Sequence, residues 1–131
     1  MYDILKARAD ALRKDLVAFT QKLVKTSSIT GDEERVADHI EAEMKEVGYD
    51  SVFRDDTGNV IGVMMGRENA PTVLLNSHMD TVAPDAEDKW IHSPYSGEVE
   101  NGRIYGVGAA DCKGGIAAHV YAGALLKSSL L

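Results

Sequence analysis

Two short stretches of the sequence carry side chains that could bind a metal ion. The first is SHMDTV, residues 77–82. Because side chains alternate along an extended chain, His78 and Asp80 are expected to point to the same side. An imidazole binds zinc through one ring nitrogen, and a nearby carboxylate can orient the ring through the other. The tripeptide alone does not distinguish a metal site from a surface loop.

The second stretch is glycine-rich and reads GVGAADCKGG, residues 106–115. Glycines allow close backbone approach and unusual dihedral angles. Asp111 stands at the entry to an expected helix, where it could cap the helix or bind a ligand. A phosphate-binding loop is disfavoured, because the GxGxxG pattern would need glycine at position 111 and no Gly-Lys-Ser/Thr follows. Lys113 is expected to be solvated.

The remaining residues with possible chemistry have simpler interpretations. On the expected helices, His39 is interpreted as solvated and His119 as a packing residue. His92 is interpreted as part of a surface loop rather than the border of a cleft, with Trp90 packing that loop onto the domain. Cys112 is interpreted as a small apolar filler rather than a ligand or nucleophile.

Helices are expected to form much of the framework that positions these residues. Apolar residues at helical spacing predict helices over residues 3–25 and 32–47, and a third helix is expected from residue 113 to the end. Thr30 and Glu33 have the spacing of a capping box at the start of the second helix.

Between the helices, alternating and apolar runs predict strands. Residues 49–54 and 60–65 are expected to form a hairpin, and residues 98–105 a second one around Asn-Gly. The run at 72–77 is apolar on both faces, as expected for a central strand. Residues 83–97 are expected to be a long loop. The pattern predicts an α/β domain with helices packed on a mixed β-sheet.

Composition narrows the functional classes. The chain has 131 residues, one cysteine and a formal net charge of -7, with acidic residues spread along its length. No run of basic residues favours nucleic acid, and no long apolar stretch favours a membrane span. The N-terminus lacks the apolar core of a signal peptide. We therefore expect a cytoplasmic protein that binds neither nucleic acid nor membranes.

Taken together, the two stretches resemble a known family. SHMDTVAPD, then Trp90 and HSPYSGEVENGRIYGVGAADCKGG, resemble the M20 metallopeptidases, a family of aminoacylase-like and carboxypeptidase-like enzymes. The early SSITGDEERVADHI is similar to the N-terminal pattern of the same family. The resemblance covers essentially the whole chain, and it implies a zinc-exopeptidase-like, phosphorylase/hydrolase-like fold. It does not name a substrate.

The resemblance implies roles for three residues. His78 would ligate one zinc ion, and Asp111 would bridge two zinc ions in the whole protein, where Co²⁺ or Mn²⁺ could replace them. Asp80 would be the catalytic residue that polarises His78. A glutamate would serve as general base. The substrate would be an N-acyl amino acid or a small peptide, and the reaction hydrolysis of its amide bond.

The resemblance also implies that residues 1–131 are the N-terminal part of a catalytic domain. The family's Glu-Glu pair, its last histidine ligand and its lid and dimerisation domain would lie outside this chain. We therefore expect the isolated chain to be inactive and the whole protein to be a homodimer. Val107 stands where the family often has arginine, which changes a local loop contact. Two alternatives stay open: a non-catalytic binding protein that retains the fold, and a different metal-dependent chemistry at the same site.

Overall fold

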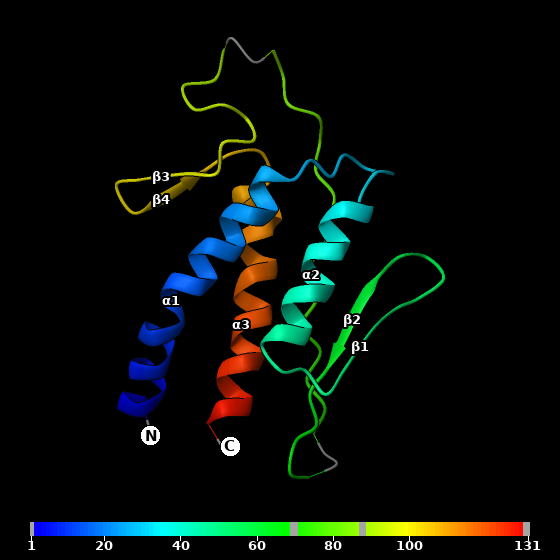
Figure 1. The fold of residues 1–131 in the computed structure, drawn as a ribbon, viewed down its shortest axis with the longest axis vertical. Coiled ribbons are helices and arrows are strands. Elements are labelled where there is room, and N and C mark those ends of the chain that lie inside the picture. Colours follow the sequence, from blue (N-terminus) through cyan, green and yellow to red (C-terminus); the bar gives the residue numbers. More distant parts are fainter. Residues whose placement is uncertain (1, 69–70, 87–88, 130–131) are drawn as a thin grey trace.

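Helices form the main body of the protein. The computed structural model describes residues 2–68, 71–86 and 89–129. Within these residues three α-helices lie side by side: α1 (Tyr2–Lys25), α2 (Glu34–Glu46) and α3 (Gly114–Ser128) (Figure 1). α3 packs along α1, and a β-hairpin packs on α2. The structure confirms the three predicted helices, with α2 slightly shorter than expected. α3 ends at Ser128, and the predicted continuation over residues 130–131 lies outside the described residues.

The core lies between the three helices. Its side chains come from the apolar stripe of each helix and are almost completely buried. They are Phe19, Leu23, Val36, Ile40, Ile116, Ala117, Val120 and Tyr121. Full burial of one large apolar side chain contributes about 1.5–3 kcal/mol to folding. This packing therefore accounts for the mutual arrangement of the helices.

The first hairpin is stabilised by its turn. Strands β1 (Ser51–Arg54) and β2 (Val60–Val63) pair in antiparallel fashion, as predicted. In the turn, the Asp55 carboxylate accepts hydrogen bonds from the amides of Thr57 and Asn59 at 3.0 and 2.9 Å and from both of their side chains. Bonds from Asn59, and then from Thr57, lower the pKa of Asp55 to about 2.

The second hairpin is also confirmed. Strand β3 (Glu98–Glu100) pairs with β4 (Arg103–Tyr105) through a two-residue turn. Asn101 and Gly102 have φ of 51° and 75°, which is the left-handed pair that such a turn requires. Both hairpins together with the helices give the α/β class that the sequence predicts.

The predicted central strand at residues 72–77 is wrong. This segment runs past α2 without forming a strand (Figure 1). The side chains of Val73 and Leu74 are 76% and 86% exposed. A strand needs a neighbour to complete its backbone hydrogen bonds, and no described residues pair with this segment. Further along, a single parallel bridge joins Ile29 to Thr81. The apolar pattern identified residues suited to burial, but it carried no information about a neighbour.

The predicted capping box at α2 is also wrong. The helix begins at Glu34, and its N-cap residue Glu33 makes no side-chain capping bond. The Glu33 carboxylate instead accepts from the Gly31 amide at 2.7 Å. The Thr30 hydroxyl donates to the Asp80 carboxylate, also at 2.7 Å. A contact with a residue far along the chain has replaced the local one.

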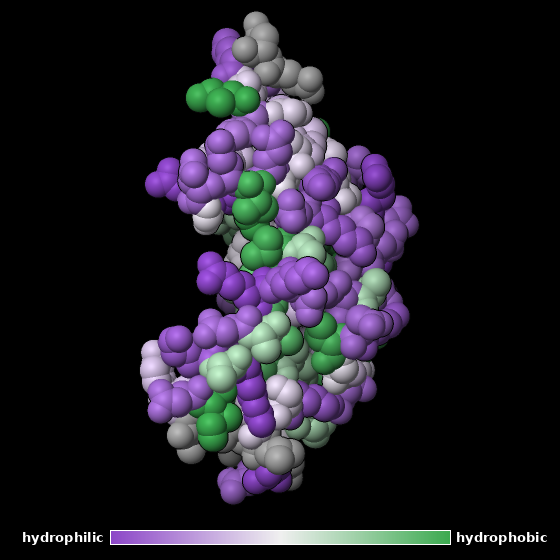
Figure 2. All heavy atoms as spheres, turned by 60° about the vertical axis from the view of Figure 1, so that its left-hand side comes forward, coloured by the Kyte–Doolittle hydropathy of each residue, from purple (hydrophilic) through white to green (hydrophobic). Residues whose placement is uncertain are grey.

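The protein surface is mainly polar. On the face presented by α1 and the β3–β4 hairpin, hydrophilic side chains predominate and apolar ones form small separate groups (Figure 2). Among the described residues, no helix combines the length and apolar character needed to cross a membrane.

Candidate metal centre

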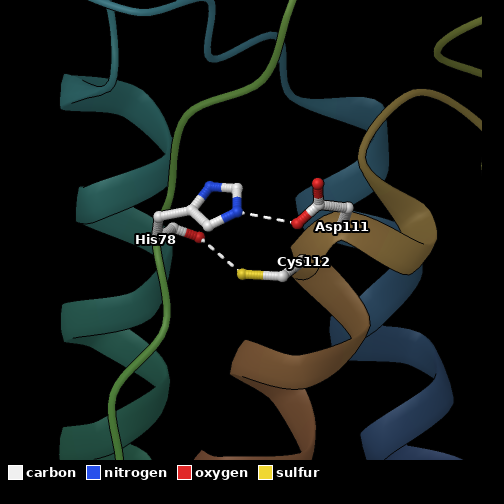
Figure 3. Close-up of side chains that lie close together, drawn as sticks. All are labelled: His78, Asp111 and Cys112. Carbon is white, nitrogen blue, oxygen red and sulfur yellow. Dashed lines mark hydrogen bonds and ion pairs between the residues drawn. The ribbon is translucent and has the colours of Figure 1, made fainter.

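Three side chains with metal-binding atoms converge near the start of α3. They are His78, Asp111 and Cys112, and one ligand atom from each lies within 4.8 Å of the others. Nε2 of His78 is 2.8 Å from Oδ1 of Asp111. The Cys112 thiol donates to the main-chain carbonyl of His78 at 3.1 Å (Figure 3). The structure thus brings together two predicted site residues that are far apart in sequence.

Asp80 lies on the opposite side of the His78 ring. Nδ1 of His78 is 3.1 Å from Oδ1 of Asp80 and 3.0 Å from its main-chain oxygen. The Thr30 hydroxyl bond is the largest cause of a lowered pKa for Asp80. Thr30, Asp80 and His78 therefore form a chain of polar contacts that fixes how the ring is turned.

The contacts of His78 decide its protonation. A carboxylate only accepts hydrogen bonds, so a ring nitrogen that contacts one must donate. Since Asp80 and Asp111 face different nitrogens, the arrangement favours a proton on both. The pKa of His78 is accordingly raised, chiefly by the bond to Asp111 and next by the main-chain oxygen of Asp80. The ring is held in a strongly anionic environment that would also attract a cation.

Backbone geometry places Asp111 at the rim of the site. The short turn Ala109–Lys113 precedes α3 and follows Gly108, whose φ is 74°. A Cβ at position 108 would lie 2.4 Å from Cγ2 of Thr81, so only glycine fits there. At Asp111 the dihedral angles leave the helical range, with φ -127° and ψ 91°. Its side chain is 88% exposed, which leaves the carboxylate accessible from solvent.

Lys113 anchors this turn to the end of α1. Its side chain is completely buried, so the prediction that it is solvated is wrong. Nζ donates to the main-chain oxygen of Thr26 at 2.7 Å, just beyond the end of α1. Burial lowers the pKa of Lys113 to about 8. The lysine therefore connects the end of α1 to the turn that carries Asp111.

The described residues of the loop before β3 (83–86 and 89–97) contribute no side chain to the cluster. His92 contacts the Glu98 carboxylate through Nδ1 at 2.6 Å and stacks on the Tyr105 ring, with a centroid distance of 4.0 Å. Its ring therefore holds the loop against the β3–β4 hairpin. Trp90, which was expected to pack this loop onto the domain, leaves 37% of its surface exposed.

Several residues of the site were not identified from sequence. Ser28 accepts from the Thr81 amide through its main-chain oxygen and donates its hydroxyl to the Met79 carbonyl, both at 2.8 Å. Thr30 was interpreted as a helix cap, and Cys112 as an apolar filler. These contacts join residues 28–30 to residues 79–81, and the local sequence gives no signal of such a pairing.

The donor atoms of the cluster suit zinc. Zinc binds imidazole nitrogen, carboxylate oxygen and thiolate sulfur, whereas magnesium and calcium prefer sites made only of oxygen. A nitrogen, an oxygen and a sulfur converge here. Each of the three is a donor type that zinc accepts, although a complete zinc site takes three or four protein ligands.

Comparisons with known proteins identify a family and several relatives. Residues 74–131 match the sequence model of peptidase family M20/M25/M40. The chain is 33% identical to the uncharacterized protein YgeY of Escherichia coli (strain K12) over 126 residues, which are 96% of this chain and 31% of YgeY. It is also 33% identical to the succinyl-diaminopimelate desuccinylase of Wolbachia pipientis subsp. Culex pipiens (strain wPip) over 114 residues, 85% of this chain and 28% of that enzyme.

A third relative is the cysteinylglycine-S-conjugate dipeptidase of Corynebacterium striatum. It is 38% identical over 92 residues, which are 68% of this chain and 20% of the dipeptidase. The chain thus spans about a third or less of the length of these relatives. The matched region 74–131 contains His78, Asp80 and Asp111 in the order and spacing described above. The chain therefore belongs to peptidase family M20/M25/M40.

Proposed function

We propose that the protein containing this chain is a zinc-dependent hydrolase of an amide or peptide bond, with His78 and Asp111 among its metal ligands. The convergence of Nε2 of His78 and Oδ1 of Asp111 at 2.8 Å carries the proposal. Membership of the peptidase family supports it, and so does the presence of a desuccinylase and a dipeptidase among the relatives. We expect the substrate to be a small N-acyl amino acid or a short peptide.

Each residue of the site has a task in this proposal. Asp80 holds Nδ1 of His78, so that Nε2 stays directed at Asp111. The proton that Nε2 shares with Asp111 would leave when zinc binds there, because a ligating imidazole is neutral. Thr30 fixes Asp80 in turn. The second carboxylate oxygen of Asp111 points away from the imidazole, where it can face a second cation (Figure 3). This geometry suits a carboxylate that bridges two ions.

Zinc would supply the electrophile, because it polarises a carbonyl group and lowers the pKa of water. The chain's own residues would orient that ion and balance its charge. Among the described residues, no glutamate joins the cluster of His78, Asp111 and Cys112. We therefore expect the general base to come from elsewhere in the whole protein, and the 131-residue chain to bind zinc without catalysing hydrolysis.

A zinc titration tests the site, and a hydrolysis assay tests the activity. Calorimetry on the chain should show zinc binding that is lost in His78→Gln and kept in His39→Gln, a histidine on α2. The product of the whole reading frame should hydrolyse N-succinyl amino acids or dipeptides in a metal-dependent way, with zinc, cobalt and manganese compared. Absence of zinc binding by both proteins would refute the proposal and favour a non-catalytic binding protein.

A further inference from the structure

We propose that His119 is a positioning residue that, through Ser77, fixes the segment carrying His78 against α3. Ring atom Nδ1 of His119 lies 2.8 Å from Oγ of Ser77, the residue directly before His78. The inference rests on the proposed function, because it assigns His119 a role in setting the distance between His78 and Asp111.

The position of His119 in α3 is unusual for a polar ring. The buried side chains of this helix are otherwise apolar or aromatic: Ile116, Ala117, Val120, Tyr121 and Ala124. His119 is only partly buried, and its ring finds a partner on a segment 42 residues away. A polar side chain in such surroundings is expected to be hydrogen-bonded. The simple packing role predicted from sequence does not explain this bond.

The His78 segment needs anchors because it forms no strand. On its C-terminal side, Ser28 and Thr30 bind the carbonyl of Met79 and the carboxylate of Asp80. On its N-terminal side, within the part of the chain that the structure describes, residues 72–77 make one side-chain hydrogen bond to a helix, the one between Ser77 and His119. The described contacts therefore hold His78 from both directions, and His119 supplies one of them.

α3 acts as the rigid reference for this segment. It contacts the segment at His119, and the residue two positions before the helix, Cys112, donates to the carbonyl of His78. Between these points the approach is close: a Cβ at Gly115 would lie 3.7 Å from Oγ of Ser77 and 3.8 Å from Cβ of Cys112. Asp111 precedes the same helix. The two contacts thus fix His78 and Asp111 to a common element.

A Ser-His catalytic pair is the other chemistry that these groups could offer. Such pairs depend on a third group, usually a carboxylate, that orients the histidine. Among the described residues, no carboxylate contacts the ring of His119. The geometry therefore favours positioning over nucleophilic catalysis.

The test compares three variants with one control. Ser77→Ala and His119→Phe remove the bond, whereas His119→Asn can restore it through its side-chain amide. His39→Phe is the control, because His39 is a partly buried histidine on another helix. Circular dichroism and thermal melting establish which variants fold. Ser77→Ala removes a single oxygen from a half-buried position, so it keeps the test valid if His119→Phe does not fold.

The first measurement needs no metal. Cys112 is the only cysteine in the chain, so its rate of reaction with a disulfide reagent reports how firmly the thiol is held against His78. We expect Ser77→Ala and His119→Phe to accelerate the reaction about fivefold, roughly the effect of one net hydrogen bond on a local opening equilibrium. His119→Asn and His39→Phe should react at the wild-type rate.

The second measurement is zinc affinity by calorimetry. Loss of a partner that orients a ligand weakens metal binding about 10- to 100-fold, so Ser77→Ala and His119→Phe should lose that much and His119→Asn little. Unchanged thiol reactivity and zinc affinity in Ser77→Ala would overturn the inference, and so would a His119→Asn variant as impaired as His119→Phe. If wild type binds no zinc, the proposed function fails, while the thiol rates still decide whether His119 positions the segment.

Discussion

The helical core and the polar anchors of the His78 segment are held by different forces. The polar anchors are the contacts of residues 77–81 with Ser28, Thr30, Cys112 and His119. Core side chains are buried and apolar, and each contributes about 1.5–3 kcal/mol. A single hydrogen bond contributes a net of about 0.5–1.5 kcal/mol. The core therefore decides whether the chain folds, and the anchors decide where His78 lies.

The difference implies that stability and metal binding can be changed separately. Substitutions in the core should lower the free energy of unfolding and leave zinc affinity of the folded molecules unchanged. Substitutions in the anchors should weaken zinc binding and leave the free energy of unfolding almost unchanged, because several of the anchoring side chains are exposed or half-buried. The predictions below test this separation, beginning with the largest expected effect.

Leu23→Ala should have the largest effect on stability. Leu23 is completely buried between the helices, and such a truncation removes apolar contacts and leaves a cavity. We expect a loss of about 2–5 kcal/mol in the free energy of unfolding, measured with urea. If that variant does not fold, Ile116→Val should lose about 0.5–1.5 kcal/mol. If the folded variant lost as much free energy of zinc binding as of unfolding, stability and metal binding would not be separable.

Asp111→Asn should have the largest effect on metal binding. The amide keeps the shape of the carboxylate but loses the charge that attracts a cation. Because loss of an outer partner already costs about 10- to 100-fold, loss of a ligand should weaken zinc binding more than about 100-fold. Stability should change little, since the side chain is 88% exposed. The matched control is Asp56→Asn in the β1–β2 turn, which should bind zinc as wild type does.

Thr30→Val should weaken zinc binding less than Asp111→Asn does. It removes the hydroxyl that donates to Asp80 at 2.7 Å, so the pKa of Asp80 should rise and its hold on His78 should loosen. We expect zinc binding to weaken about tenfold with little change in melting temperature. Thr57→Val is the control, because Thr57 also donates to an aspartate but in the β1–β2 turn. Equal losses in both variants would show that the effect is not specific to the site.

The core and the hairpins could be predicted from sequence because their signals are local. Apolar residues at helical spacing predicted the helices over residues 3–25 and 32–47, whose apolar faces supply Leu23 and Ile40 to the core. The Asn101-Gly102 pair predicted its turn, because left-handed dihedral angles favour these residues. Each of these features depends on residues a few positions apart, and sequence patterns report on that range directly.

The anchors could not be predicted, because each joins residues far apart in the chain. The contacts of Thr30 with Asp80 and of Ser77 with His119 span 50 and 42 residues. Thr30 also matched a local pattern, the capping box, which is why it was misinterpreted. At residues 72–77 the pattern showed a preference for burial, but forming a strand depends on a neighbour that the segment itself does not specify. His78, Asp80 and Asp111 were selected by their chemistry and by family resemblance, whereas their separation required coordinates.

The Asp55 turn provides the mildest and most discriminating test of the comparison. It is polar like the anchors but local in sequence and remote from His78, so Asp55→Asn should affect stability alone. Hydrogen bonds from Asn59 and Thr57 hold the pKa of Asp55 at about 2, below its ordinary value of 3.8. A lowered pKa stabilises the fold above the ordinary value, and this stability is lost as the pH falls toward 2. The difference in unfolding free energy between wild type and Asp55→Asn should therefore be full near pH 6 and shrink below about pH 4. Zinc affinity at neutral pH should be the same in both proteins. If Asp55→Asn changed the zinc affinity, a polar contact remote from His78 would influence the metal centre. The effects of the anchor substitutions would then not be specific to the anchors.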